Sequence, residues 1–275
     1  MNISASLVKE LRTLTGAGIM DAKKALIESG GEVEAAVDWL RAKGIAKAAK
    51  KSGRATGEGQ ICVATVGGSG VAVEVNSETD FVAKNTEFCG FARQVAEAAV
   101  DADNLEDLMS RNCGGATVAE ALAAKIAALG ENMSVSRMRK LEGASIASYV
   151  HNKAAENIGK IGVLVALDGE DHGIGRKIAM HVAATNPISL SEKDAPEDLV
   201  RRERQVLSEK AKASGKPEAI IEKIVDGGMK KFFTTETLLN QKFVIDPDIT
   251  VGEAAAAENV AVTGFVYLRV GESGA

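Results

Sequence analysis

The residues with the clearest potential to act on another molecule lie in one pentapeptide, Thr79–Ala83. It places a carboxylate, Asp80, beside a large aromatic, Phe81, directly after an apolar strand-like run at 70–75 and a polar turn. Side chains held at the end of a rigid strand are well placed to contact other molecules. Phe81 is either the first core residue of a following helix or an aromatic anchor for a partner's pocket. Asp80 is either a partner contact or the N-cap of that helix.

Other residues that could do chemistry are scattered. The three histidines, His151, His172 and His181, are too few and too far apart for a convincing metal site. His181 lies in the apolar run 178–184, which favours a hydrogen-bonded or interface histidine over a catalytic base. The glycine-rich run 67–70 lacks the Lys-Ser/Thr of a phosphate-binding loop and predicts a hairpin turn. We therefore expect no catalytic residue, metal or cofactor, and a protein that binds other proteins.

Composition narrows the class of protein further. The 275 residues carry a net charge of −5, which argues against a general nucleic-acid binder. No apolar run approaches the length of a membrane span, and the first residues do not resemble a secretion signal. The three isolated cysteines, Cys62, Cys89 and Cys113, suit a reducing compartment. We expect a cytoplasmic protein without direct contact to nucleic acid or membrane.

Residues 1–54 predict a small helical module followed by a basic linker. Apolar residues at helical spacing indicate a first helix with Leu7, Val8, Leu11 and Leu14 on one face, and a third with Val33, Ala36, Val37 and Leu40. The run Thr15–Gly18 separates the first two helices, and Gly44 is predicted to cap the third. The basic run 47–54 predicts a solvated tether.

An internal repeat predicts the architecture of the main body. The corresponding segments are 58–66 with 142–150, 70–75 with 162–167, and 91–96 with 174–179. Each copy has the order strand, turn, strand, loop, helix. The repeat therefore predicts two neighbouring subdomains, each a small antiparallel sheet covered by helices.

Segments outside the repeat complete the two predicted sheets. Thr117–Glu120 is a capping-box pattern that opens a helix ending near Gly130. The alternating segment 131–139 predicts a strand that completes the first sheet. The run 260–270 predicts a strand that completes the second.

A charged helical segment, 188–233, interrupts the second copy. Apolar pairs seven residues apart give it a narrow stripe, at Leu199, Val200, Val206 and Leu207. The run Ser214–Pro217 stops one helix and restarts another, which predicts a projecting antiparallel helical hairpin. After Phe233 we expect strand character to return. The predicted fold class is α+β, with units at 1–54, 55–140, 141–187 with 234–275, and the inserted 188–233.

Taken together, these segments resemble the bacterial elongation factor Ts family, guanine-nucleotide exchange factors of the GTPase elongation factor Tu. The resemblance covers nearly the whole chain and is most specific in Thr79–Ala83. It is carried by the segments 7–12, 15–18, 20–26, 74–83, 130–132, 162–165, 178–184 and 214–217.

The resemblance implies how each unit would be used. It implies a ubiquitin-associated-like N-terminal module that docks on the GTPase domain of elongation factor Tu, and a second core subdomain that contacts a β-barrel domain. It also implies a coiled-coil hairpin that some members use to dimerise. Thr79, Asp80, Phe81 and Val82 would approach the nucleotide site, with Phe81 entering an apolar slot and disturbing Mg²⁺ coordination. Further candidate partner contacts are Leu11, Gly16, Met20, His151 and His181.

Two segments depart from the family pattern. Residues 151–160 predict a longer loop than the family's usual short turn, and 271–275 have no counterpart of the helix that some members carry there. The function expected is nucleotide exchange on elongation factor Tu. The alternative is a non-exchange adaptor that uses the N-terminal helices and the hairpin. A third hypothesis is a small-molecule enzyme with a site between the repeated subdomains.

Overall fold

The structure, a computed structural model, describes residues 3–213, 215 and 217–272. Its first helices are α1 (Ala5–Thr15), α2 (Ile19–Glu28) and α3 (Val33–Lys51), which pack around small and aliphatic side chains. The predicted three-helix module is confirmed. Leu14, however, is exposed rather than part of that core.

Helix α3 is longer than predicted and connects the module to the main body. It does not end at Gly44 but continues to Lys51, so most of the predicted tether is helical. Gly44 is buried against α7 (Val118–Leu129), where a Cβ at this position would make ordinary contacts with Ala123, Ala124 and Ala127. Arg41 of α3 forms an ion pair with Glu120 of α7. A packed helix therefore holds the module on the body.

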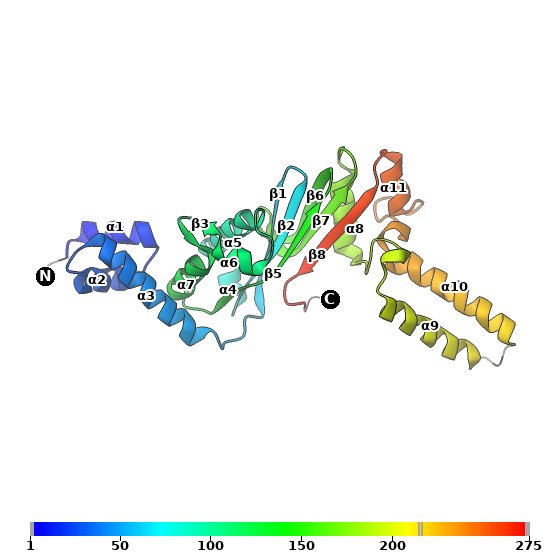
Figure 1. Cartoon of the computed structure of the whole chain (residues 1–275), viewed down its shortest axis with the longest axis horizontal. Coiled ribbons are helices and arrows are strands. Elements are labelled where there is room, and N and C mark those ends of the chain that lie inside the picture. The colour runs from blue at the N-terminus through cyan, green and yellow to red at the C-terminus, as the bar shows by residue number, and fades with distance from the viewer. Residues whose placement is uncertain (1–2, 214, 216, 273–275) are drawn as a thin grey trace.

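Six strands form one branched antiparallel sheet in the middle of the elongated molecule (Figure 1). One half has the order β5–β2–β1, and the other has β7 between β6 and β8. The strands are β1 (Glu58–Val66), β2 (Ser69–Ser77), β5 (Met133–Glu142), β6 (Ser145–Ala155), β7 (Ile158–Leu167) and β8 (Val262–Arg269). The predicted repeat is confirmed, because β1–β2 lead to α5 (Thr86–Ala99) and β6–β7 lead to α8 (Ile174–Thr185).

The two predicted sheets are joined to each other. β1 pairs with the start of β7 through Ile61–Gly159 and Cys62–Ile158. Close by, Gly162 faces Ile61 so closely that a Cβ there would lie 2.5 Å from the isoleucine side chain. Glycine is therefore needed where the two halves meet.

Helices cover the sheet and close two main cores. The first half is covered by α5, α6 (Leu105–Ser110) and α7, with Phe88 and Phe91 fully buried beneath them. A small hairpin of β3 (Asn112–Cys113) and β4 (Ala116–Thr117) precedes α7. The predicted capping box at Thr117 and the end of α7 at Gly130 are both confirmed. The second half is covered by α8 and α11 (Val251–Ala257).

The inserted helices α9 (Glu197–Lys212) and α10 (Glu218–Glu236) form an antiparallel hairpin at the opposite end of the molecule from the N-terminal module (Figure 1). The expected return to strand character after Phe233 is wrong, because α10 continues to Glu236 and α11 precedes β8. Of the predicted stop at 214–217, residues 214 and 216 lie outside the described residues. The remaining short elements are 3₁₀ turns at Glu192–Asp194 and Leu238–Asn240.

The predicted loop at 151–160 is wrong as well. β6 continues to Ala155 and β7 begins at Ile158, so only Glu156 and Asn157 form the turn. Asn157 adopts a left-handed backbone with φ 58°, which asparagine tolerates in tight turns. Within the described ranges, the helices contain no stretch long and apolar enough to cross a membrane.

Candidate functional site

Phe81 projects from helix α4 (Asp80–Ala83), a single turn directly after β2. Its side chain is 84% exposed, so the core interpretation of this aromatic is wrong. The neighbouring Val82 instead packs against the core beneath α5, and Ala83 is fully buried. Large aromatics usually bury most of their surface, so the exposure of Phe81 beside two anchored neighbours is unusual.

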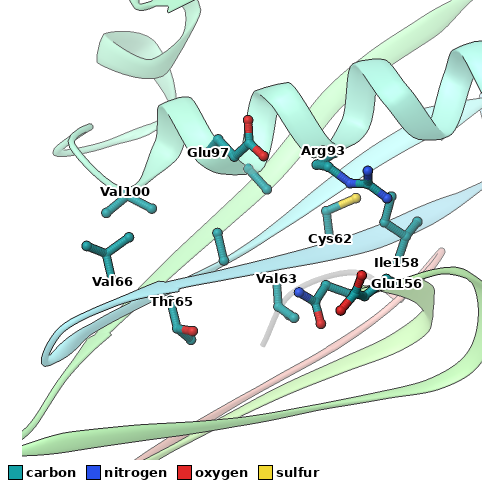
Figure 2. Close-up of a pocket in the computed structure, with 12 residues that line it drawn as sticks. Cys62, Val63, Thr65, Val66, Arg93, Glu97, Val100, Glu156 and Ile158 are labelled. Atoms are coloured by element: carbon teal, nitrogen blue, oxygen red, sulfur yellow. The ribbon is translucent and has the colours of Figure 1, made fainter.

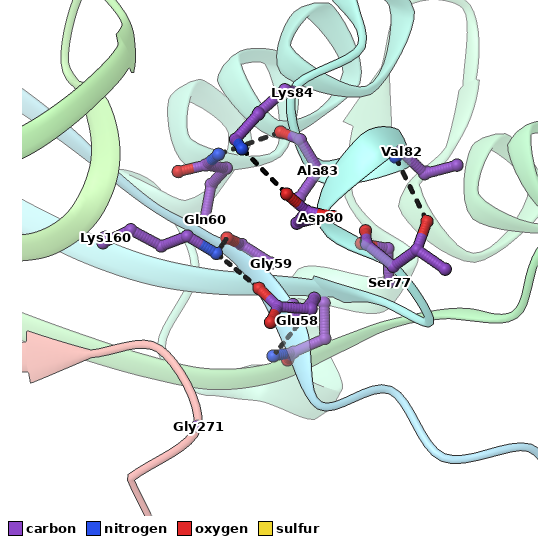
Figure 3. Close-up of polar contacts among 12 residues, drawn as sticks. Glu58, Gly59, Gln60, Ser77, Asp80, Val82, Ala83, Lys84, Lys160 and Gly271 are labelled. Atoms are coloured by element: carbon purple, nitrogen blue, oxygen red, sulfur yellow. Dashed lines mark hydrogen bonds and ion pairs between the residues drawn. The ribbon is translucent and has the colours of Figure 1, made fainter.

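Thr79 and not Asp80 caps α4. The Thr79 hydroxyl accepts a hydrogen bond from the Val82 backbone N–H at 3.4 Å. Asp80 instead pairs with Lys84 at 2.8 Å (Figure 3). The Lys84 ammonium is the main cause that lowers the pKa of Asp80 below its ordinary value, so this carboxylate stays charged at neutral pH.

Both ends of α4 are held by side chains from other elements. At the start, Glu131 accepts hydrogen bonds from the Thr79 backbone N–H at 3.0 Å and from the Thr79 hydroxyl at 2.7 Å. At the end, the buried amide of Gln60 donates to the Ala83 carbonyl at 2.9 Å (Figure 3). Phe81 therefore stands on a turn whose backbone is fixed on both sides.

A row of alternating charges continues from α4 to the second half of the sheet. Lys160 of β7 donates to the Glu58 carboxylate at 2.6 Å and to the Gly59 carbonyl at 3.1 Å (Figure 3). Lys160 is also one of the charges that lower the pKa of Asp80. The surroundings of Phe81 thus combine residues from both halves of the body.

The N-terminal module carries a second exposed apolar surface. Met20 is 77% exposed at the start of α2, and Leu14, Ile19 and Ile27 are also exposed. Gly16 ends α1 with φ +66°, a conformation that favours glycine, and turns the chain between Leu14 and Met20. Leu11 is fully buried, so it supports this surface without contributing to it.

The two remaining candidate residues, His151 and His181, lie in different environments. His151 is exposed on β6, with its Nδ1 3.1 Å from the Tyr149 hydroxyl. His181 is only 1% exposed, and its Nδ1 accepts from the Val244 backbone N–H at 3.1 Å. Its other nitrogen therefore carries the proton and donates to Gln241 at 2.8 Å. The prediction of a hydrogen-bonded histidine is confirmed, and burial lowers the pKa of His181.

Comparison with known proteins decides the family. Residues 78–272 match the family model described as Elongation factor TS. The chain belongs to the elongation factor Ts family. It is 57% identical to the elongation factor Ts of Ruegeria pomeroyi and 59% identical to that of Dinoroseobacter shibae, over 99% of this chain and 94% of each relative. The elongation factor Ts of Paracoccus denitrificans is 57% identical over 99% of this chain and 93% of its own length. This membership makes the chain a translation elongation factor.

Sequence reasoning missed four residues that this elongation factor Ts fold places at or beneath its exposed apolar side chains. The sequence predicts a strand at Glu131 and places Gln60 inside the repeat, yet both side chains hold α4. Val244 and Ile245 are exposed on a loop whose backbone His181 holds. In the sequence, the signal for that exposed surface is the apolar pair Val244 and Ile245 within an otherwise polar segment.

A cavity of about 410 Å³ lies between α5, β1 and the β6–β7 turn (Figure 2). Its lining includes Cys62, Arg93, Glu97 and Glu156. Burial raises the pKa of the Cys62 thiol, so it stays protonated and is a poor nucleophile. Among the residues that the structure describes, His, Cys, Asp and Glu form no group of three placed to hold a metal ion.

Proposed function

We propose that this chain is a guanine-nucleotide exchange factor that binds elongation factor Tu with GDP bound and promotes release of the GDP. The observation that carries the proposal is the 84% exposed Phe81 on the anchored turn α4, in a chain of the elongation factor Ts family. Phe81 enters an apolar slot beside the nucleotide site of the GTPase. The chain acts in the cytoplasm, where translation takes place, and performs no covalent chemistry.

Exchange requires that the factor bind the nucleotide-free GTPase more tightly than the nucleotide-bound one. Linkage then makes the factor weaken nucleotide binding by the same ratio. Speeding release by four to five decades needs about 5–7 kcal/mol, at 1.36 kcal/mol per tenfold. Full burial of one phenylalanine contributes about 1.5–3 kcal/mol. Phe81 therefore needs the support of a wider interface.

The exposed surfaces at the two ends of the body supply that interface. Met20 and its apolar neighbours on the N-terminal module dock on the GTPase domain, which fixes the chain beside the nucleotide. Val244 and Ile245, on the second half of the body, contact a second domain of the same partner. Exposed aliphatic side chains of this kind release water when a partner covers them, which stabilises the complex.

Close to the nucleotide, the residues of α4 act on the Mg²⁺ ion and the phosphates. The ion is the largest charge in a nucleotide site, so a small displacement of its ligands weakens the bound diphosphate. Asp80 stays ionised beside Phe81 and adds a negative charge close to the phosphates. Insertion of Phe81 and approach of Asp80 thus act on the same ion from one turn of helix.

The helical hairpin offers a contact for a second copy of the chain. Its inner face is packed through residues such as Val200, Leu207 and Val225, while Val206 and Ile220 are exposed on the outside. Burial of those outer side chains against a second hairpin would form a homodimer. Sedimentation velocity of the wild type and of Val206→Glu tests this, and a monomeric wild type contradicts it.

The proposed function is tested by GDP release. Elongation factor Tu loaded with fluorescent GDP is mixed in a stopped-flow instrument with excess unlabelled GDP, with and without this chain. We expect release to become faster by about ten-thousandfold or more, which corresponds to about 5 kcal/mol. In a pull-down, the chain should retain nucleotide-free elongation factor Tu more strongly than the GDP-bound form. Equal retention of both forms with unchanged release would indicate a non-exchange adaptor.

A further inference from the structure

Helix α4 is too short to be stable by itself. It has four residues, and an isolated helix of this length does not persist in water. The N–H of its N-cap, Thr79, and the carbonyl of its last residue, Ala83, are satisfied by side chains from outside the helix. The direction in which Phe81 points therefore depends on the side chains that hold α4 from outside.

The start of α4 is joined to the loop after α7 by a reciprocal pair of hydrogen bonds. Glu131 accepts from the backbone N–H and the hydroxyl of Thr79. In return, Glu78 accepts from the Asn132 backbone N–H at 2.6 Å. Hydrogen bonds to a carboxylate are short and strong, so the two segments are fixed against each other in both directions.

The end of α4 is held by a buried amide. Gln60 is 1% exposed on β1, and its Nε2 donates to the Ala83 carbonyl at 2.9 Å. Its Oε1, by contrast, is the one buried side-chain polar atom without a hydrogen-bond partner among the described residues. Such an atom costs stability. The hydrogen bond to the Ala83 carbonyl therefore explains a glutamine in this position better than a contribution to the stability of the core does.

We propose that Glu131 and Gln60 are positioning residues for nucleotide exchange, which hold the two ends of α4 so that Phe81 is presented in one fixed direction. The proposal rests on the exchange function proposed above. If the turn is already ordered in the free chain, none of the binding free energy is used to order it. If only a fraction of the chains carries an ordered turn, the apparent affinity for the partner falls by that fraction.

This role gives a specific kinetic result. Glu131→Ala and Gln60→Leu should raise the concentration of chain that gives half-maximal GDP release by about tenfold, if each variant leaves about a tenth of the turns ordered. The maximal release rate should stay near the wild-type value, because a saturating partner selects the ordered turn. A residue that touched the nucleotide site itself would lower the maximal rate instead.

A matched control is available at another helix. Glu253 accepts the same two hydrogen bonds, from the backbone N–H and the hydroxyl of Thr250, at the start of α11. Glu253→Ala should therefore leave the half-maximal concentration unchanged. Each variant is measured well below its own melting transition, so that loss of fold does not enter the comparison.

Two further measurements separate positioning from a general structural effect. In the free chain, amide hydrogen exchange at Val82 and Lys84 should become faster by about tenfold or more in Glu131→Ala and stay unchanged in Glu253→Ala. In a Phe81→Ala background, Glu131→Ala should cost much less in exchange than it does in the wild type, because most of its effect passes through Phe81 and only the part that passes through Asp80 remains.

Three outcomes would overturn the proposal. One is a half-maximal concentration in both variants equal to that of the wild type. Another is a cost of Glu131→Ala that adds in full to that of Phe81→Ala, because the two residues would then act separately. If the wild-type chain itself fails to speed GDP release, the exchange function is overturned and the positioning role with it; variants that match an active wild type overturn the positioning role alone.

Discussion

The Thr79 hydroxyl lies 2.7 Å from the carboxylate of Glu131, although the two residues are 52 positions apart in the chain. This bond joins the turn that carries Phe81 to the loop that follows α7. Because α7 also packs against α3, a continuous set of contacts connects the N-terminal module with Phe81. The distance between the two proposed contact surfaces is thereby fixed within the free protein.

The surface of the N-terminal module gives the first prediction. Met20→Ala should weaken binding to elongation factor Tu by about 1–2 kcal/mol, because truncation removes an exposed apolar side chain from a partner contact. Isothermal titration calorimetry with the nucleotide-free GTPase measures this. The melting temperature should not change, since Met20 is 77% exposed in the free chain.

Leu11→Ala is the matched control for that variant. Leu11 is fully buried in the same module, so its truncation should cost about 2–5 kcal/mol of stability in that unit. Leu11→Ala should melt at a lower temperature than the wild type. If Met20→Ala does so too, Met20 supports the fold and is not a partner contact.

Close packing at Gly44 gives the second prediction. A Cβ at this position would lie 3.8 Å from Ala127 Cβ, an ordinary contact, so Gly44→Ala should fit. It should stabilise the protein by about 0.5–1 kcal/mol, because glycine inside a helix is unfavourable. Gly44→Leu is too large for the space and should push α3 away from α7.

The expected result of Gly44→Leu is a larger radius of gyration in small-angle X-ray scattering and a higher half-maximal concentration in GDP release. Gly44→Ala should match the wild type in both measurements. If Gly44→Leu exchanges nucleotide as the wild type does, the fixed distance between the module and Phe81 has no role in function.

The buried His181 gives the third prediction, which concerns pH. Burial lowers its pKa in the folded chain below the ordinary value near 6.5. The unfolded chain therefore binds the proton more readily, so the contribution of His181 is fully present above pH 6.5 and is lost as the pH falls below it. The loss reaches at most about 1.4 kcal/mol per pH unit. Its cause is burial, which disfavours the charged imidazolium.

Urea unfolding between pH 5.5 and 8 measures that loss. His181→Gln should unfold with a free energy that falls less steeply below pH 6.5 than the wild type does. His172→Gln, at an exposed position, should keep the wild-type slope. Parallel curves for the wild type and His181→Gln would contradict the assignment of a neutral, buried imidazole.

Much of the fold could be predicted because local patterns agree with the global structure. Helical spacing around Leu11, the capping box at Thr117 and the repeated order of strands and helices all appear as expected. These features depend on residues close in sequence. The pairing of β1 with β7 joins Ile61 to Gly159 and brings Gly162 against Ile61, and the periodicity of neither strand predicts these contacts between residues far apart in the chain.

The errors have physical causes of the same kind. Gly44 resembles a helix cap in sequence, but its packing on α7 lets the helix continue. The polar residues of segment 151–160 predict a loop, but the segment contains the ends of two long strands and a two-residue turn between them.

At the candidate site, sequence selected Phe81 but not the side chains that hold it. Glu131 and Gln60 reach α4 from elements distant in the chain, so their role depends on tertiary structure.

The measurement that tests the account most directly compares GDP release by the wild type and by Phe81→Ala, beside a thermal melt of each. Phe81 is exposed, so its truncation should leave the melting temperature within about 2 °C of the wild type. Release from elongation factor Tu should slow by about 30-fold or more, as expected for an aromatic anchor worth at least 2 kcal/mol. A Phe81→Ala chain that releases GDP at the wild-type rate would contradict the account.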